Sequence, residues 1–386
     1  MDRVVSVDVY TLNAPVPLFS DARHDVSERE VMWVRVRTAD GLEGWGEAAV
    51  WGGPAEVTAT ILTAELAPMV IGENPNRIHY LWEKLYQHTA QHGRRGAVVA
   101  AMGSIDIALW DILGKRCGVS LATLLGRHAD DVLPYASAGF YAPGKDLTAL
   151  AAEYKQLRNR GFRAFKMKVG RQERQWSRVW ERTGTVGIQD DVERVFAVRE
   201  AIGPDALLMV DANTEWDLPT AVGFLREVES ARLFFIEEPV SPDLPHQAAE
   251  IRRKTDVRVA GFETEYTRYA YRDLLAGGAV DVVQPDPCWC GGLSEARRIA
   301  ALAAAYGRLC VPHSISSAFS FLISAQFVAS LENGFLVEWD ATGSPWMDRF
   351  LDSGQLTGDG RFVVPELPGH GFTPDLDALG EAVRKL

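Results

Sequence analysis

From about residue 132 onward, short apolar runs rich in β-branched residues alternate with amphipathic stretches. The runs number eight and occupy residues 132–141, 162–169, 206–213, 233–239, 257–263, 280–285, 308–313 and 335–340. The stretches between them, such as SEARRIAALAAAYG (294–307), place apolar residues at helical spacing. Strands that alternate with helices form parallel sheets, and eight such strands can close into a barrel. This part of the chain is therefore predicted to be an α/β barrel of the TIM type.

The residues before this pattern predict a smaller α+β unit. Apolar and polar residues alternate near the N-terminus and in VMWVRVRT (31–38), and Asp40-Gly41 then predicts a hairpin turn into GWGEA (44–48). Helical patterns follow at 55–68, 76–90 and 96–118. We predict three parts: an N-terminal domain at residues 1–125, the barrel at 126–345, and a Gly- and Pro-rich C-terminal segment at 346–386 that packs back on the N-terminal domain.

Composition excludes several classes of protein. The chain has 40 Lys and Arg against 52 Asp and Glu, a net charge of −12, and it has no basic run that would bind nucleic acid. No stretch approaches the roughly 18 apolar residues of a membrane helix, and the N-terminus lacks the apolar run of a signal peptide. Four cysteines (Cys117, Cys288, Cys290 and Cys310) make no disulfide framework. We expect reduced thiols and a cytoplasmic protein.

Three acids end successive strand runs, and their spacing predicts a metal site. Asp211, Glu237 and Glu263 are each 26 positions apart, about one strand–helix unit, so they recur at one height on neighbouring strands. In such barrels the reactive groups lie at the C-terminal ends of the strands. Carboxylates that converge there would repel one another unless a cation lies between them. Ligands that are all oxygens favour Mg²⁺, the only cofactor that the sequence predicts.

Two sets of proton carriers flank this predicted site. Lys166 and Lys168 alternate on the second run, so both point into the barrel, and a neighbouring cation is expected to lower the pKa of a lysine that acts as a base. Asp286 follows the sixth run and can orient His313, which ends the seventh. This combination predicts removal of a proton from a carbon next to a carboxylate, with the enediolate held by the metal and nearby cations.

The motifs as a set resemble the enolase superfamily, and within it the mandelate racemase-like subgroup. They run in the family's order over nearly the whole chain: SIDIALWDILGK (104–115), FKMKVG (165–170), VDAN (210–213), IEEP (236–239), AGFE (260–263), QPD (284–286), CGG (290–292), PH (312–313) and VEWD (337–340). The resemblance implies a modified (β/α)7β barrel whose N-terminal α+β domain caps the active site. Muconate cycloisomerase-like relatives carry a Lys where this chain has Asp286. The segments GGAVDVVQPD (277–286) and LPGHG (367–371) instead resemble the galactarolactone cycloisomerase and acid-sugar dehydratase branch.

The resemblance also implies roles for individual residues. Asp211, Glu237 and Glu263 would bind Mg²⁺, Lys168 would be one acid/base with Lys166 as its electrostatic partner, and His313 with Asp286 would be the opposite acid/base. Glu338 would hydrogen-bond the substrate carboxylate, and Asn213 would lie near the metal or the substrate. The loops at 18–30 and 51–54 would select the far end of the substrate. Arg23, His24 and Trp51 are candidate contacts there, although a solvated loop is the simpler interpretation of each.

These roles predict a hydro-lyase that dehydrates a sugar acid, an aldonate or aldarate, to a 2-keto-3-deoxy acid. A sugar-acid lactone cycloisomerase and a racemase or epimerase of a 2-hydroxy acid share the first half-reaction, and the residue types do not separate them. A metal-binding pseudoenzyme would lack one of the catalytic residues, and none is missing. The expected partner is a small sugar acid or its lactone, and we expect a homo-oligomer of unspecified number that binds neither nucleic acid nor membranes.

Two features depart from the family pattern. Phe262 occupies a position where Gly is common, so the wall near Glu263 is expected to differ. The residues between Lys168 and Asp211 exceed one strand–helix unit, and the surplus falls at 171–187, which carries Trp176 and Trp180. This insertion is expected to form either a lid or a subunit contact.

Overall fold

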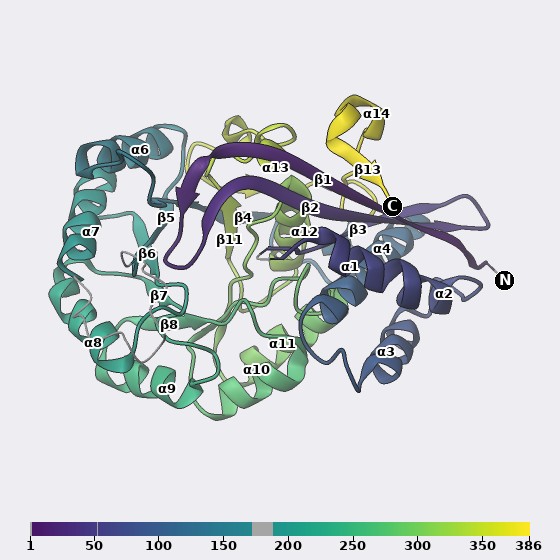
Figure 1. The fold of residues 1–386 in the computed structure, drawn as a ribbon, viewed down its shortest axis with the longest axis horizontal. Helices are drawn as coiled ribbons and strands as arrows, with labels where there is room; N and C mark the ends of the chain where they lie inside the picture. The colour runs from purple at the N-terminus through teal and green to yellow at the C-terminus, as the bar shows by residue number, and fades with distance from the viewer. Residues whose placement is uncertain (1, 52, 172–187) are drawn as a thin grey trace.

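The computed structural model describes residues 2–51, 53–171 and 188–386, and it contains two β-sheets (Figure 1). The smaller sheet is antiparallel in the order β13–β1–β2–β3, formed by Val383–Lys385, Val4–Ser20, Asp25–Thr38 and Glu43–Ala48. The larger sheet is parallel in the order β10–β9–β8–β7–β6–β5–β4–β11. Its strands are β4 Asp131–Ala138, β5 Ala164–Lys168, β6 Leu207–Asp211, β7 Phe235–Glu237, β8 Arg258–Gly261, β9 Val282–Val283, β10 Leu309–Cys310 and β11 Leu336–Asp340.

Helices connect these parallel strands and cover the outside of the curled sheet, as Figure 1 shows. They are α6 Leu147–Asn159, α7 Ile188–Ile202, α8 Leu218–Glu227, α9 Pro245–Lys254, α10 Thr267–Ala276, α11 Leu293–Ala305 and α12 Ala318–Val328. The predicted modified TIM barrel is confirmed. The predicted insertion at 171–187, with Trp176 and Trp180, lies outside the described residues apart from Arg171.

Side chains alternate along each strand, and the apolar ones that point into the barrel fill its interior with a packed layer. Each of the eight parallel strands, or the residue just after it, contributes one apolar side chain to this layer. Its members are Tyr135, Ala164, Met209, Phe235, Ala260, Val282, Val311 and Leu336. Residues two positions further along a strand face the same way, because the side-chain period of a strand is two. The layer above this one therefore consists of the strand-end residues, and it is there that polar side chains are placed.

The cap is the second unit, made of β1–β3, β13 and the helices α1 Ala55–Ile61, α2 Ala67–Val70, α3 Ile78–Thr89 and α4 Ala97–Cys117. A π-helical segment, Leu62–Leu66, joins α1 to α2. Strand β3 packs closely on α4, since a Cβ at Gly46 would lie 1.9 Å from the carbonyl oxygen of Ser104. Glycine at this position therefore allows the strand and the helix to approach.

Helix α4 is, among the described residues, the one helix long and apolar enough to cross a membrane, and 89% of its most apolar stretch is buried inside the protein. The prediction that no stretch approaches that length is wrong for α4, which is a core helix. Its acids join the cap to the rest of the chain. Asp106 accepts hydrogen bonds from the backbone N (2.9 Å) and Oγ (2.6 Å) of Ser294 at the start of α11, and burial raises the pKa of Asp106 to about 7. Asp111 accepts from the backbone N of Trp45 at 3.0 Å within the cap, and from the backbone N of His370 in the C-terminal segment at 3.2 Å.

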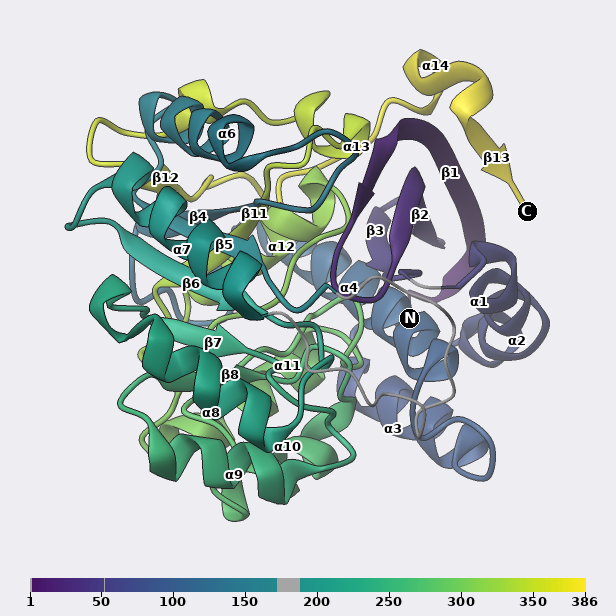
Figure 2. The same ribbon diagram turned by 60° about the vertical axis from the view of Figure 1, so that its left-hand side comes forward.

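The C-terminal segment contacts both units. Strand β12 (Phe362–Val363) pairs with barrel strand β4, and β13 pairs with β1 of the cap. Figure 2 shows β13 beside β1, with the short helix α14 (Leu376–Leu379) between β13 and the rest of the segment. Two further short helices, α5 (Leu121–Leu124) and α13 (Pro345–Asp348), complete the described helices of four or more residues. The boundaries 1–125, 126–345 and 346–386 stay a prediction.

Candidate active site

The three acids predicted to bind metal meet at the C-terminal end of the barrel. Parallel register pairs Lys168 with Asp211 and Asp211 with Glu237, and Glu263 follows the next strand, β8. One carboxylate oxygen from each of Asp211, Glu237 and Glu263 lies within 4.8 Å of the others. Asp211 and Glu237 are fully buried, and Glu263 is 7% exposed. These three acids are equally spaced in the sequence and form one cluster in the structure, because neighbouring parallel strands end at the same edge of the sheet.

This donor set fits a hard divalent cation. All three donors are carboxylate oxygens, the ligand type that Mg²⁺ prefers. Within the described residues, the buried Oε2 of Glu263 accepts no hydrogen bond, so it is available as a ligand. Phe262, the family departure beside it, is fully buried in the main hydrophobic core, and its carbonyl oxygen accepts a hydrogen bond from Tyr271 at 2.7 Å.

The two lysines of β5 are held by these carboxylates. The Nζ of Lys166 lies 2.6 Å from Glu237 Oε1, 2.7 Å from Glu338 Oε1 and 3.9 Å from Asp211 Oδ2, and Lys168 donates to Asp211 Oδ2. Burial alone would lower the pKa of both lysines, but the surrounding negative charge outweighs it and raises both pKa values. The predicted lowering of a lysine pKa concerns a site that holds Mg²⁺, so it stays a prediction.

Asp286 and His313 form a hydrogen-bonded pair on the other side of the cluster. His313 Nδ1 lies 2.8 Å from Asp286 Oδ2, and His313 Nε2 lies 3.6 Å from Glu263 Oε2. The backbone N of Cys288 donates to Asp286 Oδ1 at 2.7 Å and fixes that carboxylate. Burial opposes the charged imidazole, but Glu263, Glu338 and Asp286 together raise the pKa of His313 to about 10.

Glu338 is the middle residue of β11 and lies between Lys166 and the Asp286–His313 pair. Its Oε2 accepts a hydrogen bond from the backbone N of Ser314 at 3.0 Å, and its Oε1 faces Lys166. Burial would raise its pKa, but Lys166 and His313 lower the pKa of Glu338 to about 2. It is therefore an ionised carboxylate that shares Lys166 with Glu237.

Two amide side chains donate hydrogen bonds to carboxylates of the cluster. Asn213 donates from Nδ2 to Asp211 Oδ2 at 3.1 Å and from its backbone N to Asp211 Oδ1 at 2.8 Å. Gln284 donates from Nε2 to Glu237 Oε2 at 2.7 Å, while Lys166 occupies the other oxygen of Glu237. Sequence reasoning missed Gln284, although it stands in the QPD motif two positions before Asp286.

The cap loops are placed over the barrel mouth, but the three loop residues differ in what they reach. Arg23 donates to Thr214 Oγ1 on the loop after β6, rather than to the carboxylate cluster. His24 lies 3.2 Å from Asp21 and, with Trp51, lines a cavity of about 530 Å³. The ring of Trp51 packs on the guanidinium of Arg29 at 4.7 Å. Their roles as substrate contacts stay a prediction.

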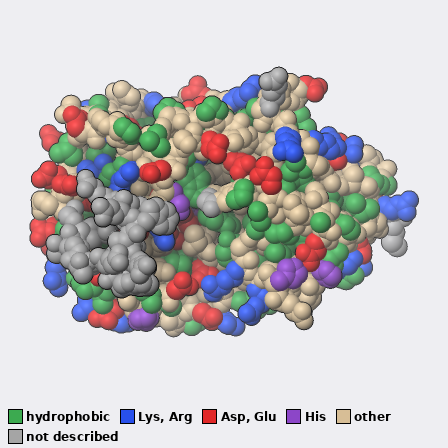
Figure 3. Space-filling view, viewed as in Figure 1, with side chains coloured by type: hydrophobic (Ala, Val, Ile, Leu, Met, Phe, Trp, Pro, Cys, Tyr) green, Lys and Arg blue, Asp and Glu red, His purple; other side chains and the backbone are tan. Residues whose placement is uncertain are grey.

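Figure 3 shows this face of the molecule, with charged side chains of both signs around a hollow between the barrel and the cap. The site as a whole therefore presents buried acids, two lysines and an Asp–His pair below an opening that the cap borders. Such a set can bind a cation and move protons on either side of a small anion.

Comparison with known proteins bears on this arrangement. Residues 4–126 match the family described as mandelate racemase/muconate lactonizing enzyme, N-terminal domain, and residues 149–378 match the enolase C-terminal domain-like family. The chain is 33% identical to an arabinonate dehydratase of Saccharolobus solfataricus over 89% of this chain and 88% of that protein. It is 34% identical to a D-galactarolactone cycloisomerase of Agrobacterium fabrum over 94% of both chains. The structure also resembles the crystal structure of a racemase from Streptomyces coelicolor with bound magnesium. The TM-score is 0.86, the two sequences are 27% identical, and the match covers 99% of this chain and 100% of that one.

Proposed function

Because the chain belongs to the mandelate racemase/muconate lactonizing enzyme family of the enolase superfamily, we propose that it is a Mg²⁺-dependent hydro-lyase that dehydrates a sugar acid to a 2-keto-3-deoxy acid. The observation that carries the proposal is the carboxylate cluster with Lys168 on one side and the Asp286–His313 pair on the other. The relative named arabinonate dehydratase supports an aldonate or aldarate as the substrate.

Asp211, Glu237 and Glu263 would hold the cation. When bound, Mg²⁺ would stabilise the negative charge that develops on the substrate carboxylate and, by competing for Asp211, lower the pKa of Lys168. Neutral Lys168 Nζ then removes the proton from the carbon next to that carboxylate. Lys166, fixed by Glu237 and Glu338, adds a positive charge that does not move during the reaction.

His313 completes the elimination. Asp286 keeps the imidazole charged and aimed, so its Nε2 proton can pass to the β-hydroxyl as the carbon–oxygen bond breaks. One water leaves, the enol that remains takes a proton at C3, and the product is the 2-keto acid. The assignment of Glu338 to the substrate carboxylate belongs to the same proposal.

A lactone cycloisomerase is the second candidate function, favoured by the relative that is 34% identical over 94% of the chain. The first half-reaction would be the same, but the leaving group would be a ring oxygen and no water would be lost. Racemisation or epimerisation would require only that the proton return on the opposite face. The three outcomes differ in product, so one experiment separates them.

That experiment is incubation with Mg²⁺ and a panel of aldonates, aldarates and lactones in deuterated water, followed by NMR and keto-acid detection. Dehydration predicts a 2-keto-3-deoxy acid, and cycloisomerisation predicts ring change without water loss. If deuterium enters at the α-carbon and no other product forms, the proposed reaction is epimerisation or racemisation and not dehydration. Lys168→Ala and His313→Asn should each abolish turnover with an unchanged circular dichroism spectrum, and Lys145→Ala serves as a control. Activity in both site variants would contradict the assigned proton carriers.

The remaining parts of the proposal concern the protein's state. Mg²⁺ binding by this chain is tested by calorimetry on EDTA-treated protein. Homo-oligomerisation, expected for such barrels, is tested by light scattering. A cytoplasmic location is supported by four cysteines that are all free, and cell fractionation tests it.

A further inference from the structure

Glu47 of the cap is a buried acid that the proposed chemistry does not use. It lies in the GWGEA segment on β3, opposite Trp33 of β2, and its side chain is 0% exposed. Its Oε2 accepts a hydrogen bond from Trp33 Nε1 at 3.0 Å and a second from the hydroxyl of Ser317. Because Ser317 belongs to the barrel, this second hydrogen bond connects the cap to the barrel.

Ser317 ends the segment that carries the catalytic histidine. This segment runs from His313, through Ser314, whose backbone N holds Glu338, to Ser317. The Ser317 hydroxyl also accepts from the backbone N of Phe319 at 3.1 Å and so caps α12. It therefore donates to the cap and accepts from the barrel helix, which fixes the far end of the segment.

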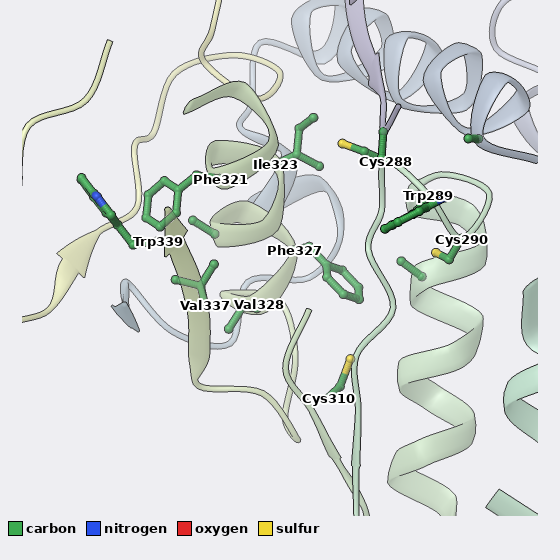
Figure 4. Close-up of a cluster of buried hydrophobic side chains, with 14 of the residues drawn as sticks. Cys288, Trp289, Cys290, Cys310, Phe321, Ile323, Phe327, Val328, Val337 and Trp339 are labelled. Carbon is green, nitrogen blue, oxygen red and sulfur yellow. The ribbon is translucent and has the colours of Figure 1, made fainter. Parts of the chain in front are cut away.

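A second contact links the same cap strand to the partner of that histidine. The backbone N of Ala49, just past β3, donates to the carbonyl oxygen of Cys288 at 2.9 Å. The backbone N of Cys288 in turn holds Asp286. Figure 4 shows Cys288 and Trp289 on the stretch between β9 and α11, in one buried cluster with Phe321 and Phe327 of α12. Residues 47–49 thus contact both loops that supply the Asp–His pair.

The charge of Asp286 acts on Glu47. Burial raises the pKa of Glu47 to about 7, hydrogen bonds from Ser316, Ser317 and Trp33 oppose the shift, and the charge of Asp286 adds to it. The position of Glu47 itself is given by its hydrogen bond from Ser317 and by the neighbouring Ala49–Cys288 backbone bond.

We propose that Glu47 is a positioning residue of the acid/base apparatus: through Ser317, and with the Ala49–Cys288 backbone bond, it lets the cap hold His313 and Asp286 as a hydrogen-bonded pair. The inference rests on the proposed role of that pair. A purely structural contact between cap and barrel would stabilise the protein without affecting the His313–Asp286 hydrogen bond in particular.

The test observes that hydrogen bond directly, by NMR of the full chain with ¹⁵N-labelled histidine and without substrate. The downfield proton of the His313 ring nitrogen that faces Asp286 is assigned by its loss in His313→Asn. Ser317→Ala and Glu47→Ala should lose or broaden this signal. Glu47→Gln should retain it, because the amide oxygen can accept from Trp33 and Ser317. If Glu47→Ala does not fold, Ser317→Ala decides.

The matched control is Ser120→Ala, which removes another helix-capping hydroxyl, at the start of α5 and away from the pair. Its signal should be unchanged. An unchanged signal in Ser317→Ala, or an equal loss in Ser120→Ala, would overturn the proposal. With an active substrate, the loss of water that His313 assists should fall about 10- to 100-fold in Ser317→Ala, while exchange of the α-proton through Lys168 persists. An equal loss of both activities would also overturn it. Absence of any turnover in the wild type would refute the proposed function, whereas the NMR result would still report on Glu47.

Discussion

Lys166 is the positive charge that two buried carboxylates share, and replacing it by Met tests the charge balance of the site. Its Nζ lies 2.6 Å from Glu237 and 2.7 Å from Glu338, and all three side chains are 0% exposed. Met keeps most of the apolar stem but carries no charge. Removing one partner of a buried ion pair costs about 3–5 kcal/mol, because the other charge stays buried without compensation. We expect the free energy of unfolding of Lys166→Met in EDTA to fall by about that amount.

Mg²⁺ should recover part of this loss, because it returns positive charge to the same carboxylates. A ligand that binds only the folded state stabilises it by about 2.7 kcal/mol at 100 times its Kd. Lys166 also competes with the cation for Glu237, so Lys166→Met should bind Mg²⁺ more tightly than the wild type does. Urea denaturation followed by circular dichroism, with EDTA or with Mg²⁺, measures the first effect, and calorimetry measures the second.

The matched control is Lys145→Met, which breaks a partly exposed pair with Glu153 at 2.6 Å. Such pairs contribute about 0–1 kcal/mol. The double variant Lys166→Met/Glu338→Gln should be more stable than Lys166→Met, since it no longer leaves that carboxylate uncompensated. The reasoning is refuted if Lys166→Met loses no more stability than Lys145→Met, or if Mg²⁺ stabilises it no more than the wild type.

Gln284→Leu removes the amide that orients Glu237 and should weaken Mg²⁺ binding about 10- to 100-fold by calorimetry; unchanged affinity would refute the orienting role. Asp106 has a raised pKa in the folded protein, so its stabilising contribution is complete below the unfolded pKa of 3.8 and is lost as pH rises through about 7. Urea denaturation of Asp106→Asn should accordingly show a flatter pH dependence between these values than the wild type, and an equal slope would contradict the assignment. Gly46→Ala forces a Cβ into the α4 backbone and should lose about 1–3 kcal/mol or more by thermal denaturation. Gly223→Ala, whose Cβ would meet nothing closer than 3.9 Å, should not.

The barrel and its carboxylate cluster could be predicted because both follow from period and register. Side chains alternate strictly along a strand, and parallel strands end at one edge, so Asp211, Glu237 and Glu263 had to converge once the strands were identified. No detail of loop conformation was needed. The cap helices could be predicted for a similar reason, since the spacing of their apolar residues does not depend on how the helices pack.

What the sequence could not provide were contacts between units and the sum of local charges. Glu47 meets Ser317 across 270 positions, and Arg23 meets Thr214 across 191, and no local pattern encodes either partner. The pKa of Lys166 depends on three carboxylates at once, which together outweigh the effect of burial, and no sequence pattern gives the sum of these effects. Gln284 carried no signal of its own, because an amide beside a strand end is as compatible with solvent as with a carboxylate.

The pairing of β1 with β13 has a consequence for how the chain matures. Tyr10 faces Lys385 across this ladder, so one border of the cap's sheet is supplied by residues that leave the ribosome after the whole barrel has been translated. Until then the β1–β2 hairpin keeps an open border able to pair with a neighbouring nascent chain. Docking of the three residues of β13 covers residues 10–12 of β1, so this part of the edge gains its partner only after the barrel has been made.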